Sequence, residues 1–193
     1  MDIEEMIANS YRNFHTKGLD YLCVKRSETH TRKVYFFEGD ASQLPEVVNP
    51  HDHRYDFQTT LLSGRMSNSI YEEVSEGGEV YNEMEYRTPL NGGAGFRFAK
   101  VTRLYENQRN TYRAGKHYYM QYNEIHTIRI REPGTVIVLD QYADIPDVGV
   151  PTKTFFPVGS QRPSFDGLYD RFTADQILAR LAQYNQLMNN HHE

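Results

Sequence analysis

Two histidines separated by a single residue, His51 and His53, are the strongest chemical signal in the chain. In a β-strand the side chains at positions i and i+2 lie on the same face, so these two imidazoles can bind one metal ion together. A His-x-His pair alone is common on protein surfaces, and the surrounding residues give this one its weight. It opens a predicted strand that ends in Leu-Leu-Ser-Gly (61–64), a pattern typical of a strand followed by a tight turn.

A third histidine, His126, begins another predicted strand. The turn before it contains Asn123, a residue type that tolerates a positive φ. If the two strands are neighbours, three imidazoles converge on one point, and imidazole is a ligand for iron, zinc, copper and nickel. We therefore expect one divalent metal ion on these three side chains.

The two segments together resemble the cupin superfamily, whose motifs are G(X)5HXH(X)3,4E(X)6G and G(X)5PXG(X)2H(X)3N. The histidine pair matches the first motif, and Gly64 lies at or one residue from its closing glycine. Gly115 and His126 have the separation that the second motif requires. The resemblance covers about residues 45–142 and implies an all-β, cupin-type double-stranded β-helix (jelly-roll) barrel with a metal site inside.

The sequence departs from these motifs in ways that change the expected site. Pro45 replaces the opening glycine and Ile130 the closing asparagine. The two positions allowed for the acidic ligand hold Phe57 and Gln58. Gln58 remains a candidate fourth ligand through its amide oxygen, with Asp56, one residue too early for the motif, as an alternative.

Three neutral imidazoles without a carboxylate leave the metal its full charge and several open coordination positions, which suits an ion that binds substrate and O2 together. Fe(II) is the favoured ion, with Zn, Mn or Ni as alternatives. Among cupins the arrangement is most similar to the three-His thiol dioxygenases of the cysteine dioxygenase type. That resemblance implies that Tyr142 lies near the metal and that Arg26 binds the substrate carboxylate. The alternatives are a tyrosine at the barrel mouth and a solvated edge charge.

Other polar residues have weaker claims to the site. Glu124 precedes His126 by two positions and is the nearest candidate general base, with a solvated loop carboxylate as the alternative. His30 lies in a predicted turn, His117 has no assigned face, and Cys23 is expected to be a small buried residue.

These residues predict a metal-dependent oxygenase, specifically an Fe(II) dioxygenase that uses O2 on a small organic substrate such as a thiol. A metal-dependent cupin lyase or isomerase without redox chemistry is the first alternative. A barrel that binds a small molecule without turnover is the second.

The elements that must position the histidines are predicted to be short strands broken by turns. Apolar spacing of three and four predicts an amphipathic helix at 2–17, and a second helix at 173–188 with Thr173 as its cap. A hairpin at 21–26 and 33–39 precedes a loop at 41–50. The remaining expected strands are 52–62, 66–74, 79–87, 95–106, 124–131 and 135–142, and a loop-like region follows Pro146.

Composition fits a single domain over 1–193, with a core barrel at about 20–145. The aromatic share is 13%, carried by 15 Tyr and 10 Phe, which are strand-favouring residues. The net charge of −5, without a basic run, argues against nucleic acid, and the absence of a long apolar window argues against a membrane span. A cytoplasmic location is expected, and a homodimer paired through edge strands is compatible with the pattern.

Overall fold

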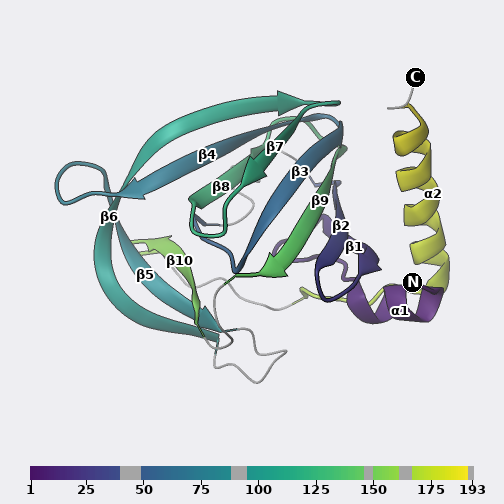
Figure 1. Ribbon diagram of the computed structural model, residues 1–193, viewed down its shortest axis with the longest axis horizontal. Helices are drawn as coiled ribbons and strands as arrows, with labels where there is room; N and C mark the ends of the chain where they lie inside the picture. The colour runs from purple at the N-terminus through teal and green to yellow at the C-terminus, as the bar shows by residue number, and fades with distance from the viewer. Residues whose placement is uncertain (40–48, 88–94, 146–149, 161–166, 191–193) are drawn as a thin grey trace.

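Two antiparallel β-sheets and two helices make up the computed structural model, which describes residues 1–39, 49–87, 95–145, 150–160 and 167–190 (Figure 1). The strands are β1 (Leu19–Arg26), β2 (His30–Phe37), β3 (Tyr55–Ser63), β4 (Arg65–Glu73), β5 (Glu79–Arg87), β6 (Gly95–Arg113), β7 (His117–Met120), β8 (Ile125–Ile130), β9 (Thr135–Asp144) and β10 (Thr152–Pro157). The helices are α1 (Ile3–Asn9) and α2 (Ala174–Asn190).

Strands β1 to β3 lie in one sheet and β4 to β6 in the other, and from β6 to β10 the chain alternates between the two sheets. The first sheet has the order β1-β2-β9-β3-β7, and the second has the order β10-β5-β6-β4-β8. The segment 50–53 joins the two edges of the second sheet, because His51 forms isolated bridges with His126 of β8 and Thr154 of β10. One layer of the barrel consists of segment 50–53, β8, β4 and β6, in that order. It faces a second layer with the order β2-β9-β3-β7, and these two layers have the strand arrangement of a jelly roll. The expected cupin-type barrel is confirmed.

The barrel interior is filled by the alternate side chains of both sheets. One buried group joins β1, β2, β3 and β9 to β4 and β8, and a second lies beside the histidines. The members of the first are Leu19, Phe37, Leu61, Met66, Ile130 and Ile137, and those of the second are Phe57, Met120 and Leu139. Each large apolar side chain that leaves water contributes about 1.5–3 kcal/mol to folding.

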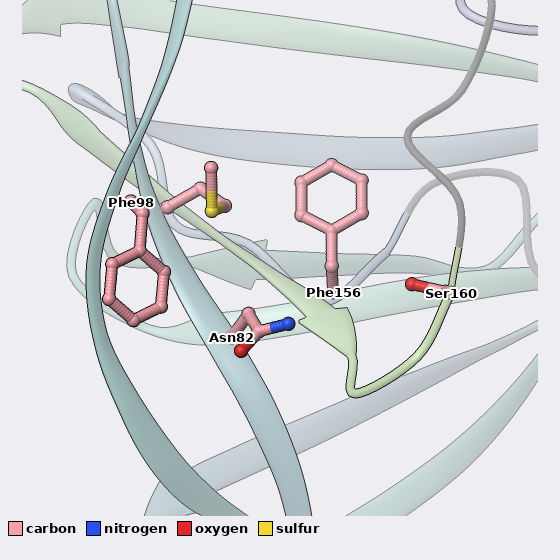
Figure 2. Close-up of a pocket in the computed structure, with 5 residues that line it drawn as sticks. Asn82, Phe98, Phe156 and Ser160 are labelled. Carbon is pink, nitrogen blue, oxygen red and sulfur yellow. The ribbon is translucent and has the colours of Figure 1, made fainter.

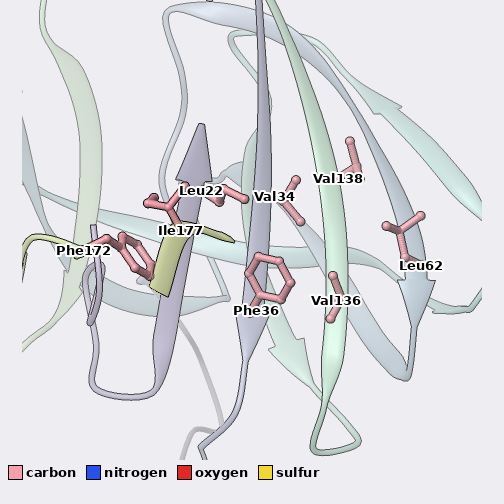
Figure 3. Close-up of a cluster of buried hydrophobic side chains, with 8 residues drawn as sticks. All are labelled: Leu22, Val34, Phe36, Leu62, Val136, Val138, Phe172 and Ile177. Atoms are coloured by element: carbon pink, nitrogen blue, oxygen red, sulfur yellow. The ribbon is translucent and has the colours of Figure 1, made fainter. Parts of the chain in front are cut away.

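The outer face of the first sheet is also buried, because α2 packs against it (Figure 1). Val34 and Phe36 of β2 point outward into this second core, and Ile177 of α2 and Phe172 reach it from the helix side (Figure 3). Its other buried members are Leu22, Leu62, Val136 and Val138. A sheet that is covered on both faces carries apolar residues at consecutive positions, so strand periodicity alone does not tell the inner face from the outer one.

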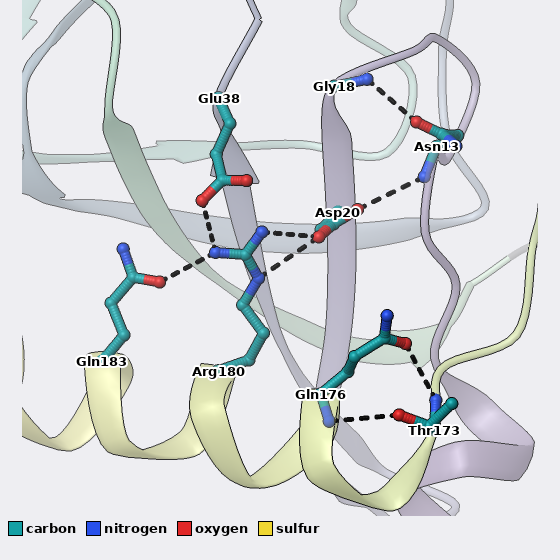
Figure 4. A network of polar contacts seen from close by, with 8 residues as sticks. All are labelled: Asn13, Gly18, Asp20, Glu38, Thr173, Gln176, Arg180 and Gln183. Carbon is teal, nitrogen blue, oxygen red and sulfur yellow. Dashed lines mark hydrogen bonds and ion pairs between the residues drawn. The ribbon is translucent and has the colours of Figure 1, made fainter.

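Polar contacts fix α2 on the sheet (Figure 4). Arg180 donates to Asp20 Oδ2 at 2.6 Å, to Glu38 Oε1 at 2.5 Å and to Gln183 Oε1 at 2.9 Å. The predicted cap of this helix is confirmed, since Thr173 Oγ1 accepts from the backbone of Gln176 at 3.3 Å. A reciprocal bond from the Thr173 backbone to the Gln176 side chain completes a capping box.

The N-terminal helix is shorter than the predicted 2–17, since α1 ends at Asn9. Tyr11 instead pairs with Tyr21 of β1 in a backbone bridge, and its ring stacks on that of Tyr21. Asn13 and His15 have φ values of 52° and 64°, which are incompatible with a continuing helix. Sheet pairing and aromatic packing outweigh the helical spacing of the apolar residues here.

Three further expectations need correction. The strand expected at 95–106 continues to Arg113, because β6 is paired along its length first with β5 and then with β4. β10 lies in the region expected to be loop after Pro146 and is paired with β5. The strand expected at 52–62 begins at Tyr55, so the histidine pair lies in the extended segment before it. Most of the loop at 41–50, Pro45 included, lies outside the described residues.

Candidate metal centre

The structure brings the three predicted histidines together. One ring nitrogen from each of His51, His53 and His126 lies within 4.8 Å of the others. His126 is buried on β8, and the other two side chains are partly buried in the segment before β3. The backbones of His51 and His126 exchange two hydrogen bonds of 3.0 and 2.9 Å, so the two halves of the site are joined directly.

The segment that carries His51 and His53 is held on both sides. The His53 backbone donates to Tyr122 O at 2.9 Å, and the Asp52 backbone donates to Lys153 O at 3.1 Å. The Lys153 backbone in turn donates to Asp52 Oδ1 at 2.6 Å. Because successive side chains of an extended segment alternate, Asp52 binds β10 while both histidines turn toward β8.

Hydrogen bonds orient two of the three rings. His126 Nδ1 lies 2.8 Å from Asn68 Oδ1, and His51 Nδ1 lies 2.9 Å from Asn49 O. Both acceptors are oxygens, so each Nδ1 carries the hydrogen and each Nε2 keeps a free lone pair. His53 Nε2 lies 2.9 Å from His126 Nε2. With metal–nitrogen bonds of about 2.1 Å, two ligands at a right angle lie about 3.0 Å apart, so this pair fits adjacent positions on one ion.

The environment favours the neutral, metal-binding form of each ring. Burial lowers the pKa of His51, against a smaller opposite effect of the hydrogen bond to Asn49. Burial also holds the pKa of His53 and His126 well below the usual value, and the charge of His51 adds to the effect in both. Neutral imidazoles with oriented Nε2 atoms are the donor set that a divalent transition metal requires. The residues present therefore fit a bound metal ion.

Aromatic rings form one wall of the site. The ring of Phe57 lies 4.7 Å from that of His53 and 5.5 Å from that of His126, between centroids. The Tyr55 ring lies 5.2 Å from His53. Phe57 is buried, so this wall excludes water from one side of the three nitrogens.

The candidate fourth ligands do not join this cluster. Gln58 pairs with Asp140 and Tyr119 in the sheet, and alternation places it on the face opposite Phe57. Asp56 shares that outer face, where its two oxygens accept from Tyr119 Oη at 2.5 Å and from the Tyr122 backbone at 2.8 Å. Among the described residues, no carboxyl side chain joins the three histidines to complete a four-ligand site.

The remaining predicted site residues also lie elsewhere. Tyr142 is 41% exposed and stacks on His30 at the outer face of β9, so the position near the metal that the resemblance implied is wrong. Arg26, at the end of edge strand β1, donates to Asn9 Oδ1 at 2.9 Å. Glu124 accepts from the Gln121 backbone at 2.6 Å within the turn before β8, which commits one of its oxygens to that turn.

Two residues that the sequence analysis passed over lie near the histidines. Lys33 alternates with the outward-facing Val34, so it points into the barrel. His15 belongs to the loop that replaces the end of the predicted helix, and its Nδ1 lies 2.8 Å from Tyr169 Oη. In the sequence, strand alternation in Lys-Val-Tyr-Phe-Phe (33–37) places Lys33 on the face opposite Val34, and this was the available signal that Lys33 could point inward.

A small pocket of about 160 Å³ lies away from this site, between β5, β6 and the end of β10 (Figure 2). Its lining consists of Asn82, Met84, Phe98, Phe156 and Ser160. None of these side chains titrates near neutral pH or is a usual metal ligand, so the pocket offers no chemistry comparable with that of the three histidines.

Across the described residues, no helix is long and apolar enough to cross a membrane.

No protein-family model matches the sequence, and no curated protein matches it significantly. Among solved structures, a variant of oxalate decarboxylase from Bacillus subtilis is similar with a TM-score of 0.43 and 12% identity over 72% of this chain and 29% of that one. The same enzyme at another pH gives a TM-score of 0.44 and 13% identity over 79% and 31%. KdgF from Halomonas sp. gives 0.38 and 14% over 65% and 79%. The chain spans less than a third of the oxalate decarboxylase. These likenesses are too distant to assign a function, which must rest on the site itself.

Proposed function

We propose that this protein is a metal-dependent enzyme of the cupin type, with His51, His53 and His126 as the metal ligands. The observation that carries the proposal is the convergence of three imidazole nitrogens within 4.8 Å in a partly buried, aromatic-lined place inside the barrel. Keeping three imidazole lone pairs close together in a partly buried place is unfavourable, and a bound cation would satisfy all three at once.

We further propose Fe(II) as the ion and O2 with a small organic molecule as the substrates. A cluster of three neutral ligands leaves the charge of the ion uncompensated and leaves coordination positions for both substrates. Bound iron would supply the electron transfer that activates O2. For a thiol substrate, addition of both oxygen atoms of O2 to the sulfur gives a sulfinic acid, RSH + O2 → RSO2H.

The protein's own contributions follow from the contacts. Asn68 orients the His126 ring through its Nδ1, which directs Nε2 toward His53. Phe57 excludes water from one side of the site, and Tyr55 extends the same wall toward β2. These side chains hold and shield the reacting groups.

The test is a metal analysis of wild type, His126→Ala and His117→Ala, each purified without chelator. His117 is exposed on β7, so its replacement controls for the loss of a histidine as such. We expect about one metal ion per wild-type and His117→Ala chain, and none in His126→Ala. Iron, followed by O2 uptake with small thiols, supports the dioxygenase.

The other results are equally informative. Zinc, manganese or nickel with activity in the absence of O2 would replace the dioxygenase by a non-redox lyase or isomerase. No metal in any of the three proteins, even after reconstitution, would contradict the enzyme proposal and leave a small-molecule-binding barrel.

A further inference from the structure

The pocket between β5, β6 and the end of β10 has walls made of apolar side chains. Phe98 of β6 and Phe156 of β10 lie on either side of it, and Met84 comes from β5, the strand between theirs (Figure 2). Met84 and Phe156 are buried, whereas Phe98 is 52% exposed. One wall is therefore an aromatic ring that is open to solvent and already held beside a cavity.

Two polar groups complete the lining. The side chains of Asn82 and Ser160 are directed toward the same space (Figure 2). The Ser160 hydroxyl donates to Pro157 O at 2.7 Å, so its lone pairs remain available as acceptors. Within the part of the chain that the structure describes, the Asn82 amide forms no hydrogen bond, so it offers both a donor and an acceptor to a bound molecule.

The size and charge of the pocket limit what it can bind. Its volume is about 160 Å³, and apolar cavities of about 150 Å³ take up benzene. Phenyl rings favour edge-to-face or offset contact with another ring, and the thioether of a methionine also binds ring edges well. None of the five lining residues carries a formal charge, so an ionised group would lose its hydration there without gaining a counter-ion.

The pairing of the strands places this pocket relative to the candidate metal centre. Residues directly opposite each other in antiparallel strands share one face of a sheet. Met84 lies opposite Thr154 of β10, and Thr154 lies opposite His51. The pocket is therefore on the sheet face that carries His51, with the Cα atom of Met84 two strand spacings, or about 10 Å, away.

We propose that this pocket is a second binding site, which holds a neutral, benzene-sized ring with a hydrogen-bonding substituent, such as a phenol. The ring lies between Phe98 and Phe156 against the Met84 thioether, and the hydroxyl exchanges hydrogen bonds with Asn82 and Ser160. The site goes beyond the proposed function, since it shares no residue with the metal centre and needs no ion.

The test follows the methyl groups of the six methionines by NMR in full-length protein labelled with ¹³C-methyl methionine. Any bound ion is first exchanged for Zn(II), which is diamagnetic and keeps the signals sharp. We expect phenol to cause a saturable upfield shift of the Met84 signal, because the probe ring lies against that methyl group. Benzoate, which has the same ring with a negative charge, should bind at least about tenfold more weakly. Met84→Leu assigns the signal.

Three variants sharpen the measurement. Phe98→Ala should weaken phenol binding about tenfold, through loss of the ring contact. Tyr105→Ala removes an equally exposed ring, 53% against 52%, from another position of β6 and should leave binding unchanged. Asn82→Ala should weaken phenol several-fold and leave benzene unaffected, which separates the hydrogen bond from a general loss of structure.

The buried methionines Met66 and Met120 report on everything else. Unchanged signals of both in Phe98→Ala show that the variant keeps its fold. No saturable shift of Met84, or equal phenol affinities of wild type and Phe98→Ala, would overturn the site. A shift of Met120 in place of Met84 would put the ring beside the histidines, because Met120 packs with Phe57, and would overturn it as well. None of these results bears on metal content, so failure of this site is distinct from failure of the metal centre.

Discussion

Each metal-binding nitrogen depends on a neighbour that is not itself a ligand. His126 is directed by Asn68, which is only 1% exposed and whose amide nitrogen donates to Met120 Sδ at 3.4 Å. Since that contact fixes the amide, its oxygen must face the His126 ring. Asn68 thus sets which nitrogen of His126 is free, in the way that outer hydrogen bonds orient metal-binding histidines in general.

Replacing Asn68 with leucine should therefore weaken metal binding by about 10- to 100-fold. Leucine keeps the approximate volume but removes the acceptor for His126 Nδ1, so the ring loses its preferred orientation. The affinity for Co(II) or Zn(II) is measured by competition with a chromophoric chelator. Ser69→Ala is the matched control, because Ser69 is the next residue of β4 and its hydroxyl donates to Glu106 on the other face. Equal affinities of Asn68→Leu and wild type would contradict this role.

At the scale of elements, two tight turns carry the chain from one sheet to the other. Gly64 connects β3 to β4 with a φ of 73°, and Gly134 connects β8 to β9 with a φ of 70°. A Cβ at Gly64 would lie 2.3 Å from Thr135 Oγ1 and 2.8 Å from Thr135 Cα, whereas a Cβ at Gly134 would meet nothing within 4 Å. The first turn is thus constrained by both backbone conformation and space, and the second by conformation alone.

Alanine at these two positions should separate the two effects. Gly134→Ala is expected to lower the free energy of unfolding by about 1–2 kcal/mol, the cost of a left-handed conformation for a residue with a Cβ. Gly64→Ala adds a clash with the backbone of Thr135 and should cost at least about 2 kcal/mol more, because displacing β9 would disturb the packed sheet. Urea unfolding measures both. A Gly64→Ala loss no larger than that of Gly134→Ala would contradict the close approach.

At the scale of the whole molecule, the first sheet is covered on its outer face by α2 over one part and by polar contacts over another. Asp140 of β9 lies in the polar part, where it accepts from Arg32 Nε at 2.7 Å and Nη2 at 3.0 Å and lies 2.7 Å from His30 Nε2. Burial alone would raise the pKa of Asp140, but the hydrogen bonds from Arg32 and His30 outweigh it and lower the pKa below 3.8.

Asp140 should therefore contribute to stability in a pH-dependent way. A carboxylate whose pKa is lower in the folded state stabilises the fold fully above its unfolded pKa of about 3.9, and this contribution is lost as the pH falls through the folded value. We expect Asp140→Asn to lower the free energy of unfolding by about 1–3 kcal/mol at pH 6, and the gap to wild type to shrink toward pH 3.

Chemical unfolding of wild type and Asp140→Asn between these pH values measures the gap. Glu85→Gln is the control, since Glu85 pairs with the exposed Arg97 and should contribute less than about 1 kcal/mol. A gap between Asp140→Asn and wild type that does not change with pH would contradict the assignment. The homodimer and the cytoplasmic location expected from the sequence stay predictions.

The sequence by itself determined the barrel and its three histidines. The i, i+2 spacing of His51 and His53 requires a common face in any extended chain, and the glycines at 64 and 134 allow the left-handed backbone conformation of a tight turn. These features depend only on residues that are close together in the sequence, so they can be predicted without knowing which distant segments pack against them. The capped C-terminal helix was predictable for the same reason, since Thr173 and Gln176 lie within one turn of each other.

Tertiary structure alone decided which polar side chains share the interior with the histidines. Both faces of the first sheet are buried, so alternation in β2 left two assignments open until α2 covered Val34 and Phe36 and turned Lys33 inward. The same fold placed Tyr142 and Gln58 on the outside and ended α1 at Asn9 through pairing of Tyr11 with β1. These outcomes depend on contacts between segments distant in the chain, and no local pattern encodes them.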